Sequence, residues 1–212
     1  MEHDFWHARW GDDRTGFHEE APNPLLVAHL SSLALAPGAR VFVPLCGKSV
    51  DLIWLRDQGF AVVGAELSPI AVAAMMAALG GAEEVSQHGA LQRYNAAGIE
   101  IFEGDIFALD ATTLGAVDAV YDRAALVALP PRMRADYASH MVALTKRAPQ
   151  LLISFAYDQA MMDGPPFSVP RSEITDLYGA THKVDPLADQ AISGRLGQRC
   201  AGREQVWRLV PH

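Results

Sequence analysis

Three charged residues lie where a nucleotide-type ligand could be held. Glu66, Asp105 and Arg123 each fall at or near the end of a short apolar run. In an open α/β sheet, ligands bind outside the carboxyl ends of the strands. There, Glu66 could accept hydrogen bonds from two ribose hydroxyls, Asp105 could accept from an adenine amino group, and Arg123 could pair with a ligand carboxylate. Purely structural interpretations also stay open: Glu66 could be a charge that caps a helix, Asp105 a charge in a loop, and Arg123 a structural arginine.

The turn after the first apolar run narrows the choice of ligand. The segment Val41–Leu55 predicts a strand, a turn and a helix, with the sequence PLCGKS at the turn. A phosphate-binding loop needs a glycine five residues before Gly47, and Phe42 stands there. A dinucleotide fingerprint needs G-x-G-x-x-G, and this turn has one glycine. The turn therefore disfavours both a triphosphate and a dinucleotide.

The elements that would position these residues alternate along the chain. Strands are predicted within residues 40–46, 60–67, 99–107, 116–122 and 150–158, and helices within 25–35, 50–59, 70–79, 132–144 and 172–179. Strands separated by helices indicate a parallel sheet with crossover helices. Two weaker strands, near 181–187 and at 204–210, indicate an antiparallel end. We therefore predict an α/β fold with a mostly parallel seven-stranded sheet, helices on both faces and an antiparallel C-terminal strand.

Composition bounds the class of protein. The chain has 212 residues, half of them hydrophobic, and a formal net charge of -8, which predicts a single domain over residues 1–212. An acidic surface repels phosphate backbones, so we expect no nucleic-acid partner. No apolar run is long enough for a membrane span, and the N-terminus lacks the features of a signal peptide. The two cysteines, Cys46 and Cys200, are expected to be reduced thiols in a cytoplasmic protein.

Five stretches of sequence carry a more specific signal. They are FW-x3-W-x6-FHE, RVFVPLCGKSVDLIWL, VVGAELS, YDRAALVAL and GPPFSVP. In this order and spacing, over nearly the whole chain, they resemble the thiopurine S-methyltransferases of bacteria. The resemblance implies a Rossmann-like methyltransferase fold with S-adenosylmethionine as the methyl donor. It also implies methyl transfer to the sulfur of aromatic and heterocyclic thiols, thiopurines among them, by a small cytoplasmic monomer.

The resemblance also assigns cofactor contacts. The matching positions are Trp10, Leu45, Glu66 and Arg123, and beyond these Trp6, Phe17, Asp105 and Ile106. Asp105 departs from the eukaryotic members, in which a smaller polar residue is expected. Trp6 and Trp10 would share one face of a helix, and aromatic rings near a sulfonium gain about 0.5–2 kcal/mol of cation–π attraction. We expect residues 1–22 to form a lid over the cofactor.

Such a methyl transfer does not require a strong acid or base from the protein. A thiolate that attacks a sulfonium methyl group neutralises charge in the transition state, which a dry pocket favours. Alignment of the two sulfur atoms supplies much of the remaining gain. Since aromatic thiols ionise partly near neutral pH, no catalytic residue is assigned, although Arg123 could steady a thiolate. No metal is expected: His3 and His7 share helical spacing, but a third ligand such as His18 would have to come from elsewhere, and surface histidines are the simpler interpretation.

The acceptor is the least determined part of this interpretation. The segment Gly164–Phe167 lacks the Asn or Asp that amino-group methyltransferases carry before a Pro-Pro pair, and we predict a rigid loop that borders the acceptor pocket. Halides and selenium or tellurium species are alternative acceptors. A non-catalytic protein that binds S-adenosylmethionine is the alternative from another class, because a fold does not determine function.

Overall fold

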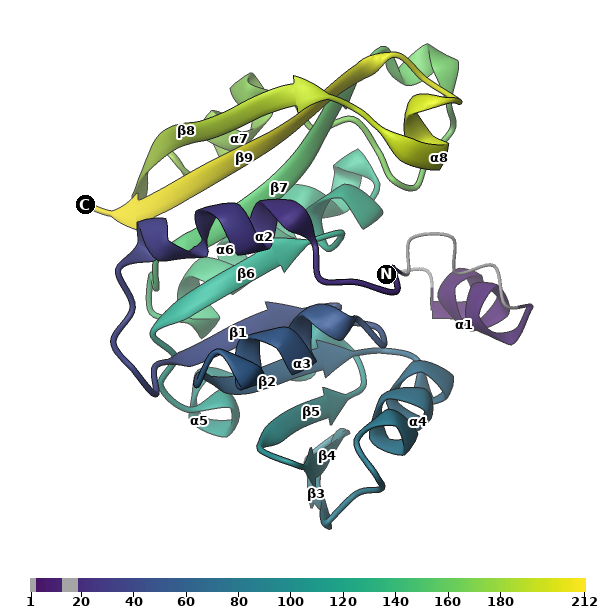
Figure 1. The fold of residues 1–212 in the computed structure, drawn as a ribbon, viewed down its shortest axis with the longest axis vertical. Coiled ribbons are helices and arrows are strands. Elements are labelled where there is room, and N and C mark those ends of the chain that lie inside the picture. The colour runs from purple at the N-terminus through teal and green to yellow at the C-terminus, as the bar shows by residue number, and fades with distance from the viewer. Residues whose placement is uncertain (1–2, 13–18) are drawn as a thin grey trace. The chain divides into compact units, whose positions relative to one another are not determined.

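The structure is a computed structural model that describes residues 3–12 and 19–212. The chain divides into two compact units, which are described separately. Unit 1 comprises residues 1–28 and 35–118, and unit 2 comprises residues 29–34 and 119–212. Figure 1 labels the helices and strands of both units.

Unit 1 holds five strands in the order β3-β4-β5-β2-β1. They are β1 (Arg40–Pro44), β2 (Ala61–Glu66), β3 (Glu84–His88), β4 (Leu91–Ala96) and β5 (Ile99–Glu103). The strands β1, β2 and β5 are parallel neighbours, whereas β4 runs antiparallel to both β3 and β5. The helices are α1 (His3–Gly11), α2 (Pro24–His29, which ends in unit 2), α3 (Val50–Asp57), α4 (Pro69–Ala78) and α5 (Ala111–Leu114), with the 3-10 turn η2 (Ile106–Ala108).

Local sequence explains where the helices of unit 1 begin. Ser49 caps α3 by accepting from the Asp51 backbone N–H, and Ser68 caps α4 in the same way. Pro69 follows Ser68 at the first position of α4, where the missing N–H of proline removes no hydrogen bond. The helix α3 crosses in front of β1 and β2 in Figure 1, and its apolar side packs into the core through Leu52 and Leu55.

Unit 2 holds four strands in the order β6-β7-β9-β8. They are β6 (Ala119–Arg123), β7 (Gln150–Tyr157), β8 (His182–Ala191) and β9 (Gly202–Pro211). The strands β6 and β7 are parallel, and β9 lies antiparallel between β7 and β8. The helices are α6 (Pro131–Leu144), α7 (Arg171–Tyr178) and α8 (Gly194–Gly197), with 3-10 turns η1 (Leu30–Leu33), η3 (Leu126–Ala128) and η4 (Gln159–Met161).

The predicted α/β fold class and the antiparallel C-terminal end are confirmed. The described residues contain nine strands, however, and not the seven predicted. The two that the prediction missed are β3 and β4, a hairpin in unit 1. The sequence EVSQH of β3 is mostly exposed and polar, so it lacks the apolar run that indicates a buried strand. The helix predicted over 25–35 is shorter, because α2 ends at His29 and a 3-10 turn follows.

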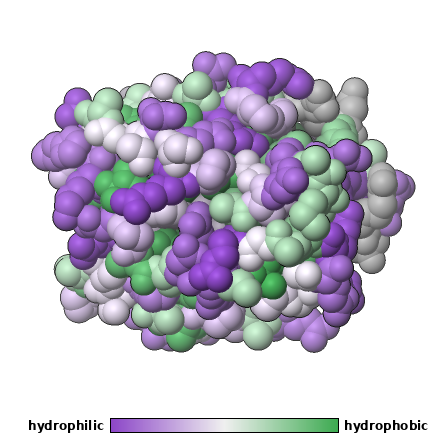
Figure 2. Space-filling view, turned by 90° about the horizontal axis from the view of Figure 1, so that it is seen from above, coloured by the Kyte–Doolittle hydropathy of each residue, from purple (hydrophilic) through white to green (hydrophobic). Residues whose placement is uncertain are grey.

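Over the described residues, the exposed large hydrophobic side chains are scattered. The large hydrophobic residues exposed in the described ranges are Phe5, Val27, Ile70, Val85 and Met161, and they belong to five different elements. The face viewed in Figure 2 shows small hydrophobic patches separated by hydrophilic side chains. None of the helices in the described ranges is long and apolar enough to cross a membrane. In the same ranges, no cluster of three or more His, Cys, Asp or Glu residues could hold a metal ion.

Candidate functional site

The turn after β1 has an unusual backbone. Leu45 lies at φ +46° and Gly47 at φ +56°, both in the left-handed region. The Cys46 N–H donates to the Ala65 carbonyl oxygen at 3.0 Å, which ties the turn to β2. A Cβ placed on Gly64 would lie 2.6 Å from the Cys46 Sγ, so the thiol fills the space over that glycine. Burial raises the pKa of the Cys46 thiol well above its ordinary value, which is consistent with a small packed residue and not a reactive one.

Glu66 joins this turn to the next. Its Oε2 accepts from the Gly47 N–H at 2.8 Å, and its Oε1 accepts from the Ser68 N–H at 2.7 Å. Burial raises the pKa of Glu66 to about 6, although these backbone hydrogen bonds favour the ionised form. Each carboxylate oxygen can accept a second hydrogen bond. Glu66 therefore shapes two strand-end turns and can accept further hydrogen bonds.

Trp10 lies against the same turn. A Cβ on Gly47 would lie 3.2 Å from the Trp10 ring, so glycine makes room for the indole. Trp10 is buried, and the Lys48 Nζ lies 5.8 Å from the centre of its ring. The structure thus brings together Trp10, the turn and Glu66, as the prediction requires. The Lys48 ammonium group lies over the Trp10 ring, an interaction that the sequence did not indicate.

The remaining predicted residues of unit 1 are less closely grouped. Asp105 caps η2, and its Oδ1 accepts from the Phe107 N–H at 3.1 Å, while Ile106 is buried beside it. Asp105 lies at the same strand-end edge as Glu66, since the Gly104 N–H donates to the Glu66 carbonyl oxygen at 2.9 Å. Trp6 lies on α1 with its ring edge-on to that of Phe5, 5.3 Å between centres. Phe17 lies outside the described residues.

In unit 2, the turn after β6 has its own buried carboxylate. Arg123 is the last residue of β6, and Asp122 lies beside it with no exposed surface. The Asp122 carboxylate accepts from the Leu126 N–H at 3.1 Å and from the Tyr137 hydroxyl at 2.8 Å. Burial raises the pKa of Asp122 to about 6. The sequence placed Asp122 at the strand end but indicated no role for it.

A buried arginine holds the loop that follows β7. The Arg134 Nε donates to the Leu129 carbonyl oxygen at 2.9 Å, and its Nη1 donates to both carboxylate oxygens of Glu173 on α7. The same Nη1 reaches the Ser168 carbonyl oxygen at 3.2 Å, and the guanidinium lies 5.6 Å from the centre of the Phe167 ring. Sequence reasoning missed Arg134, because its partners lie far along the chain and no local pattern marks it.

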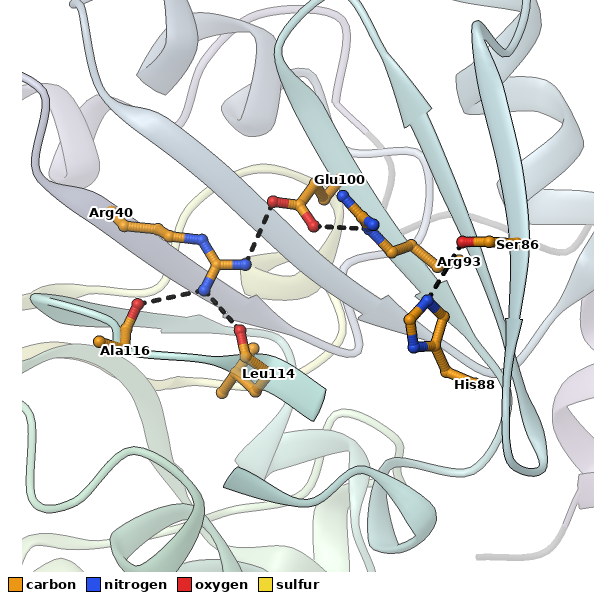
Figure 3. Close-up of polar contacts among 7 residues, drawn as sticks. All are labelled: Arg40, Ser86, His88, Arg93, Glu100, Leu114 and Ala116. Carbon is orange, nitrogen blue, oxygen red and sulfur yellow. Dashed lines mark hydrogen bonds and ion pairs between the residues drawn. The ribbon is translucent and has the colours of Figure 1, made fainter. Parts of the chain in front are cut away.

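A second charged cluster lies at the other end of the unit 1 strands. Arg40, at the start of β1, donates to the carbonyl oxygens of Leu114 and Ala116 and pairs with Glu100 at 3.2 Å (Figure 3). Glu100 also pairs with Arg93 of β4 at 2.8 Å. These ion pairs and hydrogen bonds join β1, β4 and β5 to the segment before β6. The cluster is therefore structural and separate from the strand ends that carry Leu45 and Glu66.

Comparisons with known proteins identify the family of this chain. Residues 1–209 match the family described as Thiopurine S-methyltransferase (TPMT). A Thiopurine S-methyltransferase of Xanthobacter autotrophicus is 56% identical over 210 residues, 99% of each chain.

Two solved structures are similar in fold. One is a 1,6-didemethyltoxoflavin-N1-methyltransferase of Burkholderia thailandensis with bound S-adenosylhomocysteine, which has a TM-score of 0.66 and 16% identity and covers 98% of this chain and 87% of its own. The other is a magnesium protoporphyrin IX methyltransferase of Synechocystis, also with the demethylated cofactor bound, which has a TM-score of 0.65 and 16% identity and covers 98% and 97%. At this identity, the two structures support the fold alone.

Proposed function

Because the chain belongs to the thiopurine S-methyltransferase family, we propose that it methylates the sulfur of thiopurines and other aromatic or heterocyclic thiols. The protein is an S-adenosylmethionine-dependent methyltransferase. The observation that carries the thiol acceptor is the family match, which runs over residues 1–209 and so includes the loops of both units. We further propose that residues 1–212 act as one methyltransferase domain, as a monomer in the cytoplasm.

The turn after β1 and the end of β2 fit an S-adenosyl cofactor. Glu66 offers an acceptor site on each carboxylate oxygen beyond its backbone hydrogen bonds, which suits the two hydroxyls of a ribose. Gly47 lets the Trp10 ring pack against this turn, because a Cβ there would lie 3.2 Å from the ring. Leu45, at φ +46°, supplies backbone and apolar surface at the same turn. These residues would hold the nucleoside part of the cofactor.

The other predicted contacts extend this assignment. Asp105 would accept from the adenine amino group beside the buried Ile106, and Trp6, Trp10 and Phe17 would cover the cofactor from the N-terminal segment. Arg123 would pair with the carboxylate of the methionine end. Asp122 supports that role, because the hydrogen bonds it accepts from Leu126 and Tyr137 define the turn that follows Arg123.

When bound, S-adenosylmethionine supplies a methyl group carried on a positively charged sulfur. The protein's part is to exclude water and orient the acceptor, since a dry site favours the neutralisation of charge. Neither buried carboxylate is suited to act as a base toward the acceptor. Glu66 is engaged by two backbone donors, and Asp122 is closed off by Tyr137. We therefore assign no catalytic base, and the guanidinium of Arg123 would steady an acceptor thiolate through its charge.

An acceptor panel tests the proposed function. The purified protein would be given S-adenosylmethionine with a thiopurine, thiophenol, an aliphatic thiol, iodide or selenite, and S-adenosylhomocysteine formation would be measured. We expect the thiopurine and thiophenol to be the best substrates. Turnover confined to iodide or selenite would replace the thiol proposal with one of the other acceptors. Cofactor binding without turnover on any acceptor would favour a non-catalytic binding protein.

A further inference from the structure

The loop after β7, residues 158–170, is held in place by hydrogen bonds to β7 and to the turn η3 that follows β6. The Val169 N–H donates to the Phe155 carbonyl oxygen of β7 at 2.7 Å, and the Phe167 N–H donates to the Val127 carbonyl oxygen at 2.6 Å. Val127 lies in η3, the turn that follows Arg123. Ligands of open α/β sheets bind outside the carboxyl ends of parallel strands, and β6 and β7 are parallel. The loop therefore borders the ligand-binding end of this unit.

One side chain links three parts of this loop. The Gln159 Nε2 donates to the Met162 carbonyl oxygen at 2.6 Å and to the Tyr157 hydroxyl at 3.2 Å. The Gln159 Oε1 accepts from the Ser168 N–H at 2.9 Å. The amide thus joins the end of β7, the end of η4 and the segment after the Pro-Pro pair. Only a side chain that both donates and accepts can make this set of bonds.

The partners of Gln159 are themselves fixed. The Tyr157 hydroxyl donates to the Pro166 carbonyl oxygen at 2.5 Å, and the Tyr157 N–H donates to the Ser168 Oγ at 3.0 Å. Burial raises the pKa of the Tyr157 phenol, so this hydroxyl keeps its proton. Met162 is buried in a small apolar cluster with Ile192 and Cys200. Gln159 therefore connects the loop to groups that cannot easily move.

We propose that Gln159 is a positioning residue that holds the segment Pro166–Ser168 in place as a wall of the methyl-acceptor site. This inference rests on the proposed function, because it needs an acceptor to be bound at this end of unit 2. Gln159 touches no reacting atom and acts through Pro166 and Ser168. Its loss should therefore weaken use of the acceptor and leave the cofactor affinity unchanged, since the residues assigned to the nucleoside lie in unit 1.

The variant Gln159→Glu tests this role with almost no change of shape. The carboxylate can still accept from the Ser168 N–H, but it cannot donate to the Met162 carbonyl oxygen. Since Gln159 is exposed, the fold should survive the change. We expect the KM for thiophenol to rise about tenfold with kcat changed less, and the affinity for S-adenosylhomocysteine to stay within about twofold.

A pH profile separates this role from general destabilisation. Protonation of the carboxylate introduced by Gln159→Glu restores a donor for the Met162 carbonyl oxygen. The ratio of variant to wild-type kcat/KM should therefore rise as the pH falls from about 7.5 to about 5.5. The ionisation of the thiol affects both proteins equally and cancels in the ratio. A structural defect would produce no recovery at low pH.

The matched control is Gln87→Glu in unit 1. The Gln87 Nε2 also donates to two backbone carbonyl oxygens, those of Gly89 and Leu91, at 2.9 and 3.0 Å. This variant loses the same kind of bonds at the β3–β4 hairpin and should leave the acceptor KM unchanged. An unchanged KM in Gln159→Glu, or an equal rise in both variants, would overturn the inference. Absence of thiol turnover by the wild type would instead overturn the proposed function.

Discussion

Glu66 and Asp122 are two buried carboxylates at the ends of parallel strands, one in each unit. Burial raises the pKa of each to about 6. They differ in the groups that donate to them. Glu66 accepts from backbone N–H groups, those of Gly47 and Ser68 among them, whereas Asp122 accepts from backbone groups and also from the hydroxyl of Tyr137. Glu66 keeps 6% of its surface exposed, and Asp122 keeps none.

The comparison shows that an acidic residue at a strand end can have either of two roles. A carboxylate that accepts from backbone N–H groups and retains exposed surface can also accept hydrogen bonds from a ligand. A carboxylate closed by a buried phenol is committed to the turn beside it. We therefore propose that Glu66 binds the cofactor and that Asp122 supports the turn beside Arg123.

The largest effect is expected for Glu66→Gln. The variant amide would turn its NH₂ group toward the N–H of Gly47 or Ser68, so donor would face donor, and the charge-assisted bonds to ribose would be lost. We expect the affinity for S-adenosylhomocysteine to fall about 100-fold, which corresponds to about 2.7 kcal/mol, as measured by titration calorimetry. An affinity within threefold of wild type would remove Glu66 from the cofactor site.

Tyr137→Phe is the counterpart in unit 2. It removes the hydroxyl that donates to Asp122 and leaves a buried carboxylate oxygen without that partner. The free energy of unfolding should fall by about 1–3 kcal/mol, measured by urea denaturation. The cofactor affinity of the folded variant should change less than that of Glu66→Gln. If both variants weakened the cofactor equally, the two carboxylates would not have distinct roles.

The pH dependence of cofactor binding follows from the raised pKa of Glu66. Ribose hydroxyls favour the ionised carboxylate, so binding should weaken as the pH falls below about 6, by about tenfold at pH 5 relative to pH 7. The Glu66→Gln variant should lose this dependence. A wild-type affinity that is flat between these pH values would argue against direct contact.

The stability of the ligand-free protein should show the opposite trend. Both carboxyls have folded pKa values near 6, above their ordinary values of 4.5 and 3.8. Their contribution to stability is therefore fully present below about pH 4 and is lost as the pH rises through 6. Comparison of unfolding midpoints for wild type, Glu66→Gln and Asp122→Asn would show how much each carboxyl contributes.

The smallest effect is expected for Gly47→Ala. The new Cβ would lie 3.2 Å from the Trp10 ring on a backbone with φ +56°. We expect α1 to loosen, which faster limited proteolysis of the N-terminal segment would detect, and the cofactor affinity to fall about fivefold. Gly38→Ala is the matched control, because Gly38 has φ +78° with nothing within 4 Å of a Cβ. Equal effects of both variants would indicate backbone strain alone and no contact with Trp10.

The sequence predicted the surroundings of Glu66 in unit 1 better than those of Asp122 in unit 2. The strand-end pattern identified Glu66 and the turn at Gly47, because both follow from short runs of apolar residues and glycine. The Trp10 contact and the thiol acceptor came from the resemblance to a family. The hydrogen bond from Tyr137 to Asp122 and the one from Arg134 to Glu173 depend on where α6 and α7 pack, which no local pattern encodes. The hairpin of β3 and β4 was missed for a related reason, since an exposed polar strand gains its stability from its neighbours.

The central claim is that the cofactor's methyl group moves to a thiol sulfur. The most direct test is to supply S-adenosylmethionine with a ¹³C-labelled methyl group, together with thiophenol, and to follow the label by NMR. We expect the label to leave the cofactor and to appear as an S-methyl group on the thiol, with one equivalent of S-adenosylhomocysteine formed. Tight binding of the cofactor with the label retained on it, in the presence of thiophenol and of a thiopurine, would show that the protein does not methylate these thiols.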